Sequence, residues 1–382
     1  MAAPSFTEIA FPLVGGLGMF LFGMKQMSDG LRRAAGGRLE HILGVLCKTL
    51  PMAILLGMVV TCVVQSSSAT TVMVVGFVNA RLLALRQAIG AVMGANIGTT
   101  ITAWLVAAGL SVKALKISTY ALPMIGLGFL LNTAMRRRGW RLFGQVILGL
   151  GLLLFGLGVM KDAFGPLAKS EHTKDLFARF STNPLLGVLV GAVVTMLLQS
   201  SSATIAIVQV LAAQGIVSLD AAIPLMLGDN IGTTITAQLA AIGTNRNARR
   251  AARAHLLFNV LGVLWVLPLV YLGVFGRIVD AIVPGLPQGA AVPHIAAAHT
   301  LFNVVNTLLF LPMIGLLERT AIRLAGGADK DDDGEARYLE PHLLDTPRAA
   351  MEGARREIVR MMEIAREVVT QAKTGLVQTD HG

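Results

Sequence analysis

The sequence is poor in charged residues. Only 14% of its 382 residues are charged, 54% are hydrophobic and the mean hydropathy is +0.68. A soluble fold of this length would carry far more charge, so the composition excludes an ordinary water-soluble domain. It indicates instead an all-α membrane protein with several spanning helices.

The sequence also has few cysteines and lacks two common catalytic motifs. Cys47 and Cys62 are the two cysteines, too close in sequence to indicate a disulfide framework. The serine runs lack a Gly-x-Ser-x-Gly elbow, and the chain has no Walker-type phosphate loop. The sequence therefore predicts neither a hydrolase nor an ATP-driven pump, and it predicts no cofactor.

Seven apolar runs are long enough to cross about 30 Å of hydrocarbon, which takes roughly 20 helical residues. They lie at residues 9–27, 87–110, 116–134, 142–160, 221–243, 254–275 and 294–317. Two further apolar stretches, 52–79 and 184–212, carry a polar QSSSAT segment at their centre. Its flanking arms are too short to span, so we expect two re-entrant helical hairpins.

Basic residues are distributed unevenly. Residues 1–317 carry 22 Lys/Arg and 9 Asp/Glu, whereas residues 318–382 carry 10 and 13. In the expected membrane order the basic clusters, including Lys25 and Arg32 after the first span, fall on one side. By the positive-inside rule this side is cytoplasmic, and no nucleic-acid partner is indicated. We expect an inner (plasma) membrane protein with its N-terminus outside and its C-terminus in the cytoplasm, and interfacial helices at 31–48 and 166–180.

The polar segments belong to an internal duplication. QSSSATT at 65–71 recurs as QSSSATI at 199–205. GANIGTTITA at 94–103 recurs as GDNIGTTITA at 228–237. Both pairs have the same offset along the chain, so the spacing between the two motifs is identical in the two copies.

An apolar segment recurs as well. GLGMFLFG at 16–23 matches GLGLLLFG at 149–156, with nearly the same offset. The first span is expected to run inward and its repeat, the fourth, to run outward. Inverted-topology repeats with interrupted helices are typical of secondary transporters.

The residue types in the two copies suit an ion site. We expect glycines at 94, 98, 228 and 232 to let the helices unwind, exposing carbonyls to a hard cation such as sodium. The half-helix that follows would present N–H groups to an anion. One isolated serine run would indicate helix packing, but two matched copies favour a site. The candidate ligands are Gln65, Ser66, Ser67, Ser68, Asn96, Thr99, Thr100, Gln199, Ser200, Ser201, Ser202, Asn230, Thr233 and Thr234.

Five other residues are accessory candidates. Asp229, where the first copy has Ala95, is either a cation or proton site or a cap of the following half-helix. Thr61 and Thr195 each stand four residues before a motif glutamine. His255 and His299, in the matching phrases AHLLFN and AHTLFN, are either hydrogen-bonded packing residues or contacts of a transported anion.

The paired motifs resemble those of the type II sodium-phosphate cotransporter family, which has one QSSS motif in each inverted repeat and a Gly-x-Asn-x-x-Thr segment. The resemblance covers about residues 10–317 and implies sodium-driven movement of inorganic phosphate by alternating access around the two QSSS motifs. Asp229 departs from the small residue expected there. From the residues alone, only a site for an anion with cations follows. A phosphate-sensing membrane scaffold without transport, and export of phosphate or a related oxyanion, stay open.

The expected domain organisation follows from the repeat. Residues 1–140 form the first transmembrane repeat, with hairpin 52–79 and interrupted helix 87–110. Residues 141–317 form the second repeat plus an extra helix, with hairpin 184–212 and interrupted helix 221–243. Residues 318–346 form an acidic cytoplasmic linker.

The C-terminal segment, residues 347–382, contains an amphipathic helical pattern that resembles the opening helix of a PhoU-type regulatory bundle. One helix does not make a complete bundle. Either the domain is truncated, or the helix pairs with another subunit in a homo-oligomer or with a PhoU-type partner, or it is a short solvated helix without a function.

Overall fold

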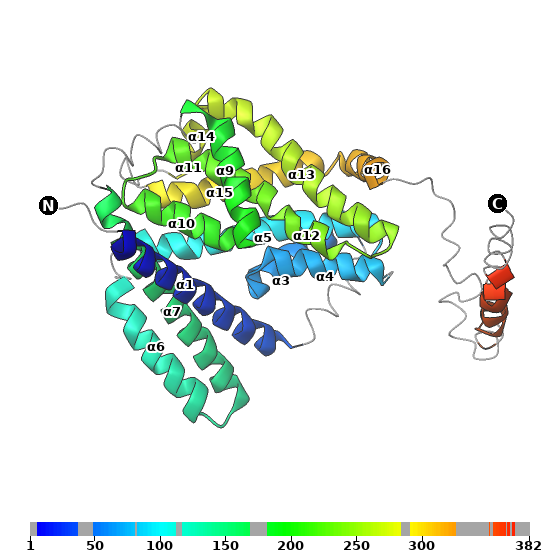
Figure 1. Ribbon diagram of the computed structural model, residues 1–382, viewed down its shortest axis with the longest axis horizontal. Coiled ribbons are helices and arrows are strands. Elements are labelled where there is room, and N and C mark those ends of the chain that lie inside the picture. Colours follow the sequence, from blue (N-terminus) through cyan, green and yellow to red (C-terminus); the bar gives the residue numbers. More distant parts are fainter. Residues whose placement is uncertain are drawn as a thin grey trace, which may run out of the picture. The chain divides into compact units, whose positions relative to one another are not determined.

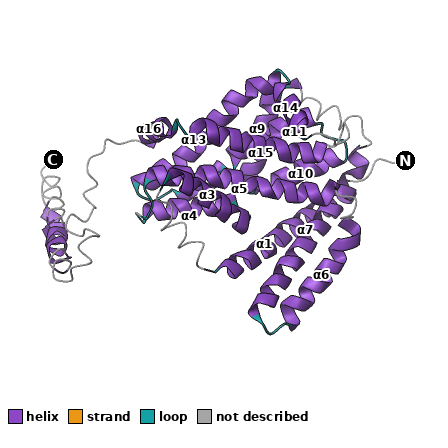
Figure 2. Ribbon diagram, turned by 180° about the vertical axis from the view of Figure 1, so that it is seen from behind, coloured by secondary structure: helices purple, strands orange, loops and turns teal. Residues whose placement is uncertain are grey.

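The computed structural model describes residues 6–36, 49–80, 82–111, 117–168, 182–283 and 291–325, together with short stretches between 351 and 370. The regular elements in these ranges are all helices (Figure 2). The prediction of an all-α protein is therefore confirmed. The chain divides into two compact units, residues 1–325 and 326–382, which are described separately.

The first unit contains the broken and unbroken helices that build the candidate site (Figure 1). In chain order they are α1 (Phe6–Ala35), α3 (Leu50–Val64), α4 (Ser67–Asn79), α5 (Leu85–Ser111), α6 (Ile117–Ala134), α7 (Arg138–Ala168), α9 (Pro184–Leu198), α10 (Ser201–Ala213), α11 (Leu219–Gly232), α12 (Thr234–Ala240), α13 (Arg246–Tyr271), α14 (Val274–Ile282), α15 (Ala291–Phe310) and α16 (Ile314–Ala325).

Fewer full-length spans are present in the described chain than the seven expected. Four helices, α1, α5, α7 and α13, are long and apolar enough to cross a bilayer. Helices α15 and α16 would add a fifth only as one unit, and they are bent by 88° relative to each other. The expected run 294–317 crosses that bend, and the run 221–243 is divided between α11 and α12.

Each QSSS segment lies at a break between two helices, α3 and α4 in the first copy and α9 and α10 in the second. Gln65 and Gln199 have φ angles of 53° and 50°, the only positive values at non-glycine residues among those described. Side chains with a Cβ are disfavoured in this left-handed region. The two copies therefore share the same strained turn, a kind of strain that clusters at functional sites.

The glycines of the second motif serve packing rather than unwinding. Helix α5 continues through Gly94, so the interrupted helix expected at 87–110 is not present. A Cβ at Gly94 would lie 1.9 Å from the Ile54 carbonyl oxygen, and one at Gly228 would lie 2.0 Å from the Val188 oxygen. Absence of a side chain thus allows α3 to touch α5, and α9 to touch α11, backbone to backbone. Only the second copy is interrupted, between α11 and α12 at Thr233.

Helices α1 and α7 cross through the glycines of the apolar repeat. A Cβ at Gly16 would lie 3.0 Å from the Gly156 oxygen, and one at Gly23 would lie 2.6 Å from the Gly149 oxygen. Rising residue numbers in α1 therefore pair with falling numbers in α7, so the two helices are antiparallel (Figure 1). In the repeat, Gly16 corresponds to Gly149 and Gly23 corresponds to Gly156. The contact of Gly16 with Gly156 is therefore the symmetry equivalent of the contact of Gly23 with Gly149.

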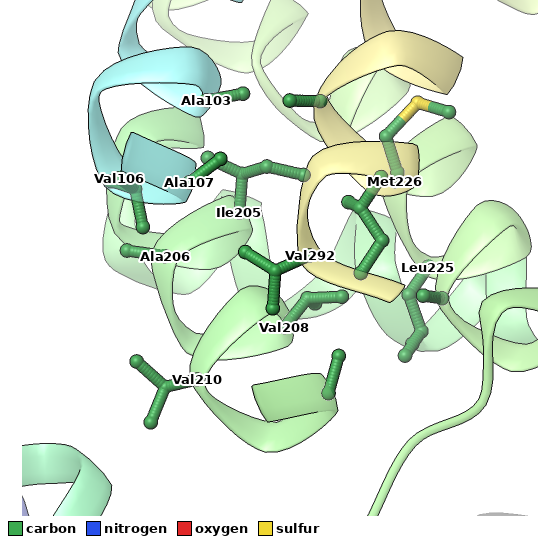
Figure 3. Close-up of a cluster of buried hydrophobic side chains, with 14 of the residues drawn as sticks. Ala103, Val106, Ala107, Ile205, Ala206, Val208, Val210, Leu225, Met226 and Val292 are labelled. Carbon is green, nitrogen blue, oxygen red and sulfur yellow. The ribbon is translucent and has the colours of Figure 1, made fainter. Parts of the chain in front are cut away.

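Helix α5 connects the two copies in the hydrophobic core. Its C-terminal half contributes Ala103, Val106 and Ala107 to a buried cluster with α10, α11 and α15 (Figure 3). Its N-terminal half packs with α3, α4 and α13 in a second cluster. One continuous helix therefore contacts both arms of the first broken pair and α10 of the second.

The remaining expectations concern the segments around the core. Helix α16 extends to Ala325, past the expected start of the linker at residue 318, and the rest of that linker lies outside the described residues. Most of the expected interfacial segments also lie outside them. In the second unit, residues 354–363 are helical, as expected. The side chains of Ile358 and Met361 are 58% and 60% exposed there.

Candidate functional site

The two QSSS segments line the same cavity. Its volume is about 310 Å³, near the lower limit for ligand sites and ample for a tetrahedral oxyanion. All eight motif residues contribute to its wall although the two copies lie far apart in the sequence: Gln65, Ser66, Ser67, Ser68, Gln199, Ser200, Ser201 and Ser202. The structure thus brings together the central residues that the sequence singles out.

Two helix N-termini open onto this cavity. Ser66 and Ser200 are the N-caps of α4 and α10, and their hydroxyl oxygens accept hydrogen bonds from the Ala69 and Ala203 N–H groups at 3.1 and 3.2 Å. Other first-turn N–H groups have no partner within their own helix and carry the positive end of its dipole. Such paired N-termini are suited to binding an anion.

The two motif glutamines are held differently. The Gln65 carboxamide donates to the Cys62 carbonyl at 2.6 Å and accepts from the Thr102 hydroxyl at 3.1 Å, so it is fixed against α5. The repeat partner of Thr102 is Thr236, which donates to the Thr233 carbonyl of its own segment instead. Gln199 is exposed and lacks this anchor.

Helix α1 adds charged groups that lie outside the two repeated motifs. Lys25, Ser28, Asp29 and Arg32 line the same cavity, and their spacing of three, four and seven residues places them on one helix face. The Ser28 hydroxyl donates to the Val64 carbonyl, which fixes this face against the end of α3. Their helical spacing is the signal in the sequence that could have found them, whereas the positive-inside rule treats Lys25 and Arg32 only as cytoplasmic charges. Together the three charged side chains give the cavity wall a net charge of +1.

A cluster of oxygen atoms surrounds Thr195. Its Oγ1 lies 2.8 Å from Asp229 Oδ1, 2.8 Å from the Gly191 oxygen and 2.9 Å from Thr204 Oγ1. A single hydroxyl proton can serve only one of these acceptors. Asp229 is fully buried, and its Oδ2 has no hydrogen-bond partner within the described part of the chain. An ionised carboxylate in this position is costly, so the cluster is suited to a bound cation or proton.

The alternative role of Asp229 as a helix cap is not seen. Its carboxylate accepts from the Thr195 hydroxyl, while α12 begins after Thr233 without a side-chain cap. In the first copy Ala95 replaces the acid, and Thr61 donates to Thr70 at 3.0 Å. Thr61 and Thr195 therefore bridge the two arms of their broken helix pairs one turn from the tip, and neither lines the cavity.

The threonines of the second motif do not line the cavity either. Thr100, Thr233 and Thr234 donate to carbonyls of their own segments at 2.7–2.9 Å. Thr99 Oγ1 is buried and has no partner among the described residues. These hydroxyls are occupied by the backbone or enclosed by packing in this conformation.

The two asparagines of the second motif are also buried. Asn96 donates to the Asn259 side chain at 3.0 Å and so links α5 to α13. Asn230 donates to the Met226 carbonyl of its own helix at 2.9 Å. The structure therefore separates the QSSS residues, which face a cavity, from the Gly-x-Asn-x-x-Thr residues, which pack behind it.

His255 and His299 are buried and do not line the cavity. Neither ring has a hydrogen-bond partner in the ranges that the structure covers, so the hydrogen-bonded packing role is not seen. Their backbone carbonyls accept hydrogen bonds from Asn259 and Asn303 one turn later, at 3.0 and 2.9 Å. The phrases AHLLFN and AHTLFN thus encode the same local arrangement in α13 and α15.

Comparisons with known proteins found one matching family and several relatives. A family model described as Na+/Pi-cotransporter matches residues 19–162 and again residues 163–279, so each match contains one QSSS motif. The chain is similar to "Putative inorganic phosphate export protein YjbB" of Escherichia coli (strain K12), with 32% identity over 97% of this chain and 65% of that protein. It therefore spans about two thirds of the length of this relative.

Two further relatives cover less of the chain. "Uncharacterized protein YqeW" of Bacillus subtilis (strain 168) is 35% identical over 65% of this chain and 78% of its own length. "Sodium-dependent phosphate transport protein 2B" of Homo sapiens is 39% identical over 33% of this chain and 20% of its own length. No solved structure matches the chain.

The Thr102 anchor of Gln65 can be tested with a control inside the repeat. We expect Thr102→Val to lower the free energy of unfolding by about 1–3 kcal/mol, because it leaves the Gln65 carbonyl oxygen unpaired. Thr236→Val removes the equivalent hydroxyl without this loss and should have a smaller effect. Thermal unfolding of the purified protein in detergent measures both. Equal destabilisation by the two changes would show that the anchor has no special role.

Proposed function

The chain belongs to the Na+/Pi-cotransporter family, and from this we propose that it is a sodium-coupled secondary transporter of inorganic phosphate. The observation that carries the proposal is the single cavity lined by both QSSS segments, with two helix N-termini facing it. The fourteen motif residues named from the sequence remain the proposed machinery. The QSSS residues contact the ions, and the Gly-x-Asn-x-x-Thr residues hold them in place.

Phosphate binding would rest on three kinds of donor. The serine hydroxyls and the first-turn N–H groups of α4 and α10 supply neutral hydrogen bonds, and Lys25 and Arg32 supply charge. A phosphate group carries about −1.5 to −2 at pH 7. The net charge of +1 on the cavity wall therefore leaves negative charge uncompensated. A sodium ion bound at the same time would neutralise it, which gives a physical reason for coupling.

A sodium site next to Asp229 follows from the oxygen cluster around Thr195. Carboxylate, hydroxyl and carbonyl oxygens are the ligands that hard cations prefer. Asp229 has one oxygen unpartnered within the described residues, and a cation there would offset the cost of its burial. Because Ala95 takes this position in the first copy, the site would exist in one repeat only. A proton is the alternative occupant.

The proposed transport cycle is alternating access between inverted repeats, residues 1–140 and 141–317, about a central site. It is supported by the antiparallel crossing of α1 and α7 and by the matching left-handed turns at Gln65 and Gln199. In the proposed inner-membrane orientation the C-terminus is cytoplasmic. Arg33, Arg138 and Arg141 line one pocket, which supports placing these basic clusters on one side.

Two further assignments remain proposals. Residues 347–382 would act as a partial PhoU-like segment, and the exposed Ile358 and Met361 would meet a second copy or a PhoU-type subunit. Export of phosphate is the second candidate function, because the Escherichia coli relative is named for export. Phosphate loss from intact cells that overproduce the chain, measured against uptake, distinguishes the two directions.

The central prediction concerns flux. Purified protein in liposomes should take up labelled phosphate faster when a sodium gradient is imposed than when sodium is equal on both sides. Gln65→Ala and Gln199→Ala should greatly reduce this flux while leaving the protein folded. An equal rate of phosphate uptake with and without the sodium gradient would contradict sodium coupling. Phosphate binding without flux would favour the sensing scaffold.

The charges of α1 give a second prediction. Lys25→Gln and Arg32→Gln should each raise the KM for phosphate about tenfold, because each removes a charge-assisted contact to the anion. Arg136→Gln is the control, since this exposed arginine lines neither the QSSS cavity nor the pocket of Arg33, Arg138 and Arg141. The measurement is the phosphate concentration dependence of uptake at saturating sodium. If the KM moves equally in all three variants, these charges act only by long-range attraction.

The coupling ion gives a third prediction. Asp229→Asn should raise the sodium concentration for half-maximal uptake about tenfold or more, since it removes the charged ligand while keeping the shape. Asp220→Asn, at the exposed start of the same helix, should leave it unchanged. Sodium titrations of uptake at fixed phosphate measure both. An unaltered sodium dependence in Asp229→Asn would place the ion elsewhere.

A further inference from the structure

A second cavity lies where the ends of α1 and α6 meet the start of α7. Its volume is about 360 Å³, and it shares no lining residue with the QSSS cavity. It is lined by Arg33, Asn132, Arg138, Arg141, Leu142 and Gln145. Three guanidinium groups and two carboxamides thus face one space without a carboxylate, and the proposed transport cycle makes no use of them.

Helix geometry builds this arginine pocket. Arg138, Arg141 and Gln145 follow one another at three and four residues, so they share a face of α7. Gln145 is buried and donates to the Gln26 side chain at 3.0 Å, which holds α7 against α1. On the other side, a Cβ at Gly144 would lie 2.5 Å from the Asn132 nitrogen. Backbone contact between α6 and α7 therefore brings Asn132 to the pocket.

The positive charge of the pocket favours binding of an anion. None of the three guanidinium groups forms an ion pair with a carboxylate of the described chain. Arginine presents a planar set of N–H donors that matches phosphate oxygens two at a time. The two carboxamides add neutral donors. The ligand chemistry is therefore that of a phosphate anion, which could be part of a lipid headgroup or free in solution.

The surroundings favour a lipid. Trp140 and Phe143 lie in the same turns of α7 as the pocket arginines but on its opposite, outer face, where they are 51% and 52% exposed and pack edge to face with centroids 5.9 Å apart. Exposed aromatic side chains mark the headgroup level of a bilayer. On α6 the neighbouring Phe129 and Leu130 are also exposed and would meet acyl chains. These side chains place the pocket at the headgroup level, where the phosphate of a lipid is the anion at hand.

We propose that the arginine pocket binds the phosphate of an anionic phospholipid headgroup. Basic pockets between membrane helices are suited to such headgroups. The bound lipid joins the ends of α1, α6 and α7 at the membrane surface. Arg33 faces this pocket while its neighbour Arg32 faces the QSSS cavity, so the lipid also fixes the helix that carries the proposed phosphate-binding charges.

The test uses the full chain and a charge-matched control. Arg138→Gln/Arg141→Gln removes two pocket charges, whereas Arg136→Gln/Arg137→Gln removes two charges of the same turn that do not line the pocket. The proteins are reconstituted into phosphatidylcholine nanodiscs with or without phosphatidylglycerol. Lipid retained after return to detergent is counted by native mass spectrometry, and the unfolding midpoint is measured in the nanodiscs.

Wild type and control should retain phosphatidylglycerol in preference to phosphatidylcholine and unfold at a higher temperature in its presence. The pocket variant should bind it about thirtyfold more weakly and lose that stabilisation. Equal loss in the control, or no preference in wild type, would overturn the proposal. Displacement of the lipid by inorganic phosphate would identify a free-phosphate site instead. If the double variant does not fold, Arg33→Gln on α1 provides the same comparison, with an expected weakening of about fivefold.

Discussion

A helix that breaks inside an apolar medium leaves backbone N–H and C=O groups that water cannot satisfy. The structure depends on how two such breaks are tolerated. Ser66 and Ser200 cap the half-helices that follow, and Gln65 and Gln199 turn the chain through the left-handed region that side chains with a Cβ disfavour. The remaining first-turn N–H groups of α4 and α10 face a shared cavity, where an anion can accept hydrogen bonds from them. The same backbone groups that make the break costly therefore make the site.

Close helix packing keeps these breaks in place. Gly94 and Gly228 allow backbone contact between α3 and α5 and between α9 and α11, and Gly23 and Gly149 do the same for α1 and α7. Each contact has a counterpart in the other copy. Function has nevertheless diverged between the copies, since Gln65 is anchored to α5 while Gln199 is not, and Asp229 has no partner acid in the first copy. The helix packing is thus duplicated, whereas the candidate site is asymmetric.

Helix α1 links the two charged regions of the molecule. Its consecutive residues Arg32 and Arg33 face different cavities, one lined by the QSSS segments and one by the start of α7. Because a helix is rigid over one turn, anything that fixes one face also fixes the other. The proposed ion site and the proposed lipid pocket are therefore connected through one rigid helix.

The membrane class, the duplication, the breaks at QSSSAT and the eight QSSS residues of the cavity could be predicted from the sequence, because period, apolarity and exact repetition are local properties of the chain. The sequence could not give the continuity of α5 through Gly94, since a glycine suits an unwound turn and a close contact equally well. Nor could it give the place of Lys25, Asp29 and Arg32, whose charges fit either a solvated end or a cavity wall. These points depend on three-dimensional packing, because it alone brings α1 and the two half-helix N-termini together around one space.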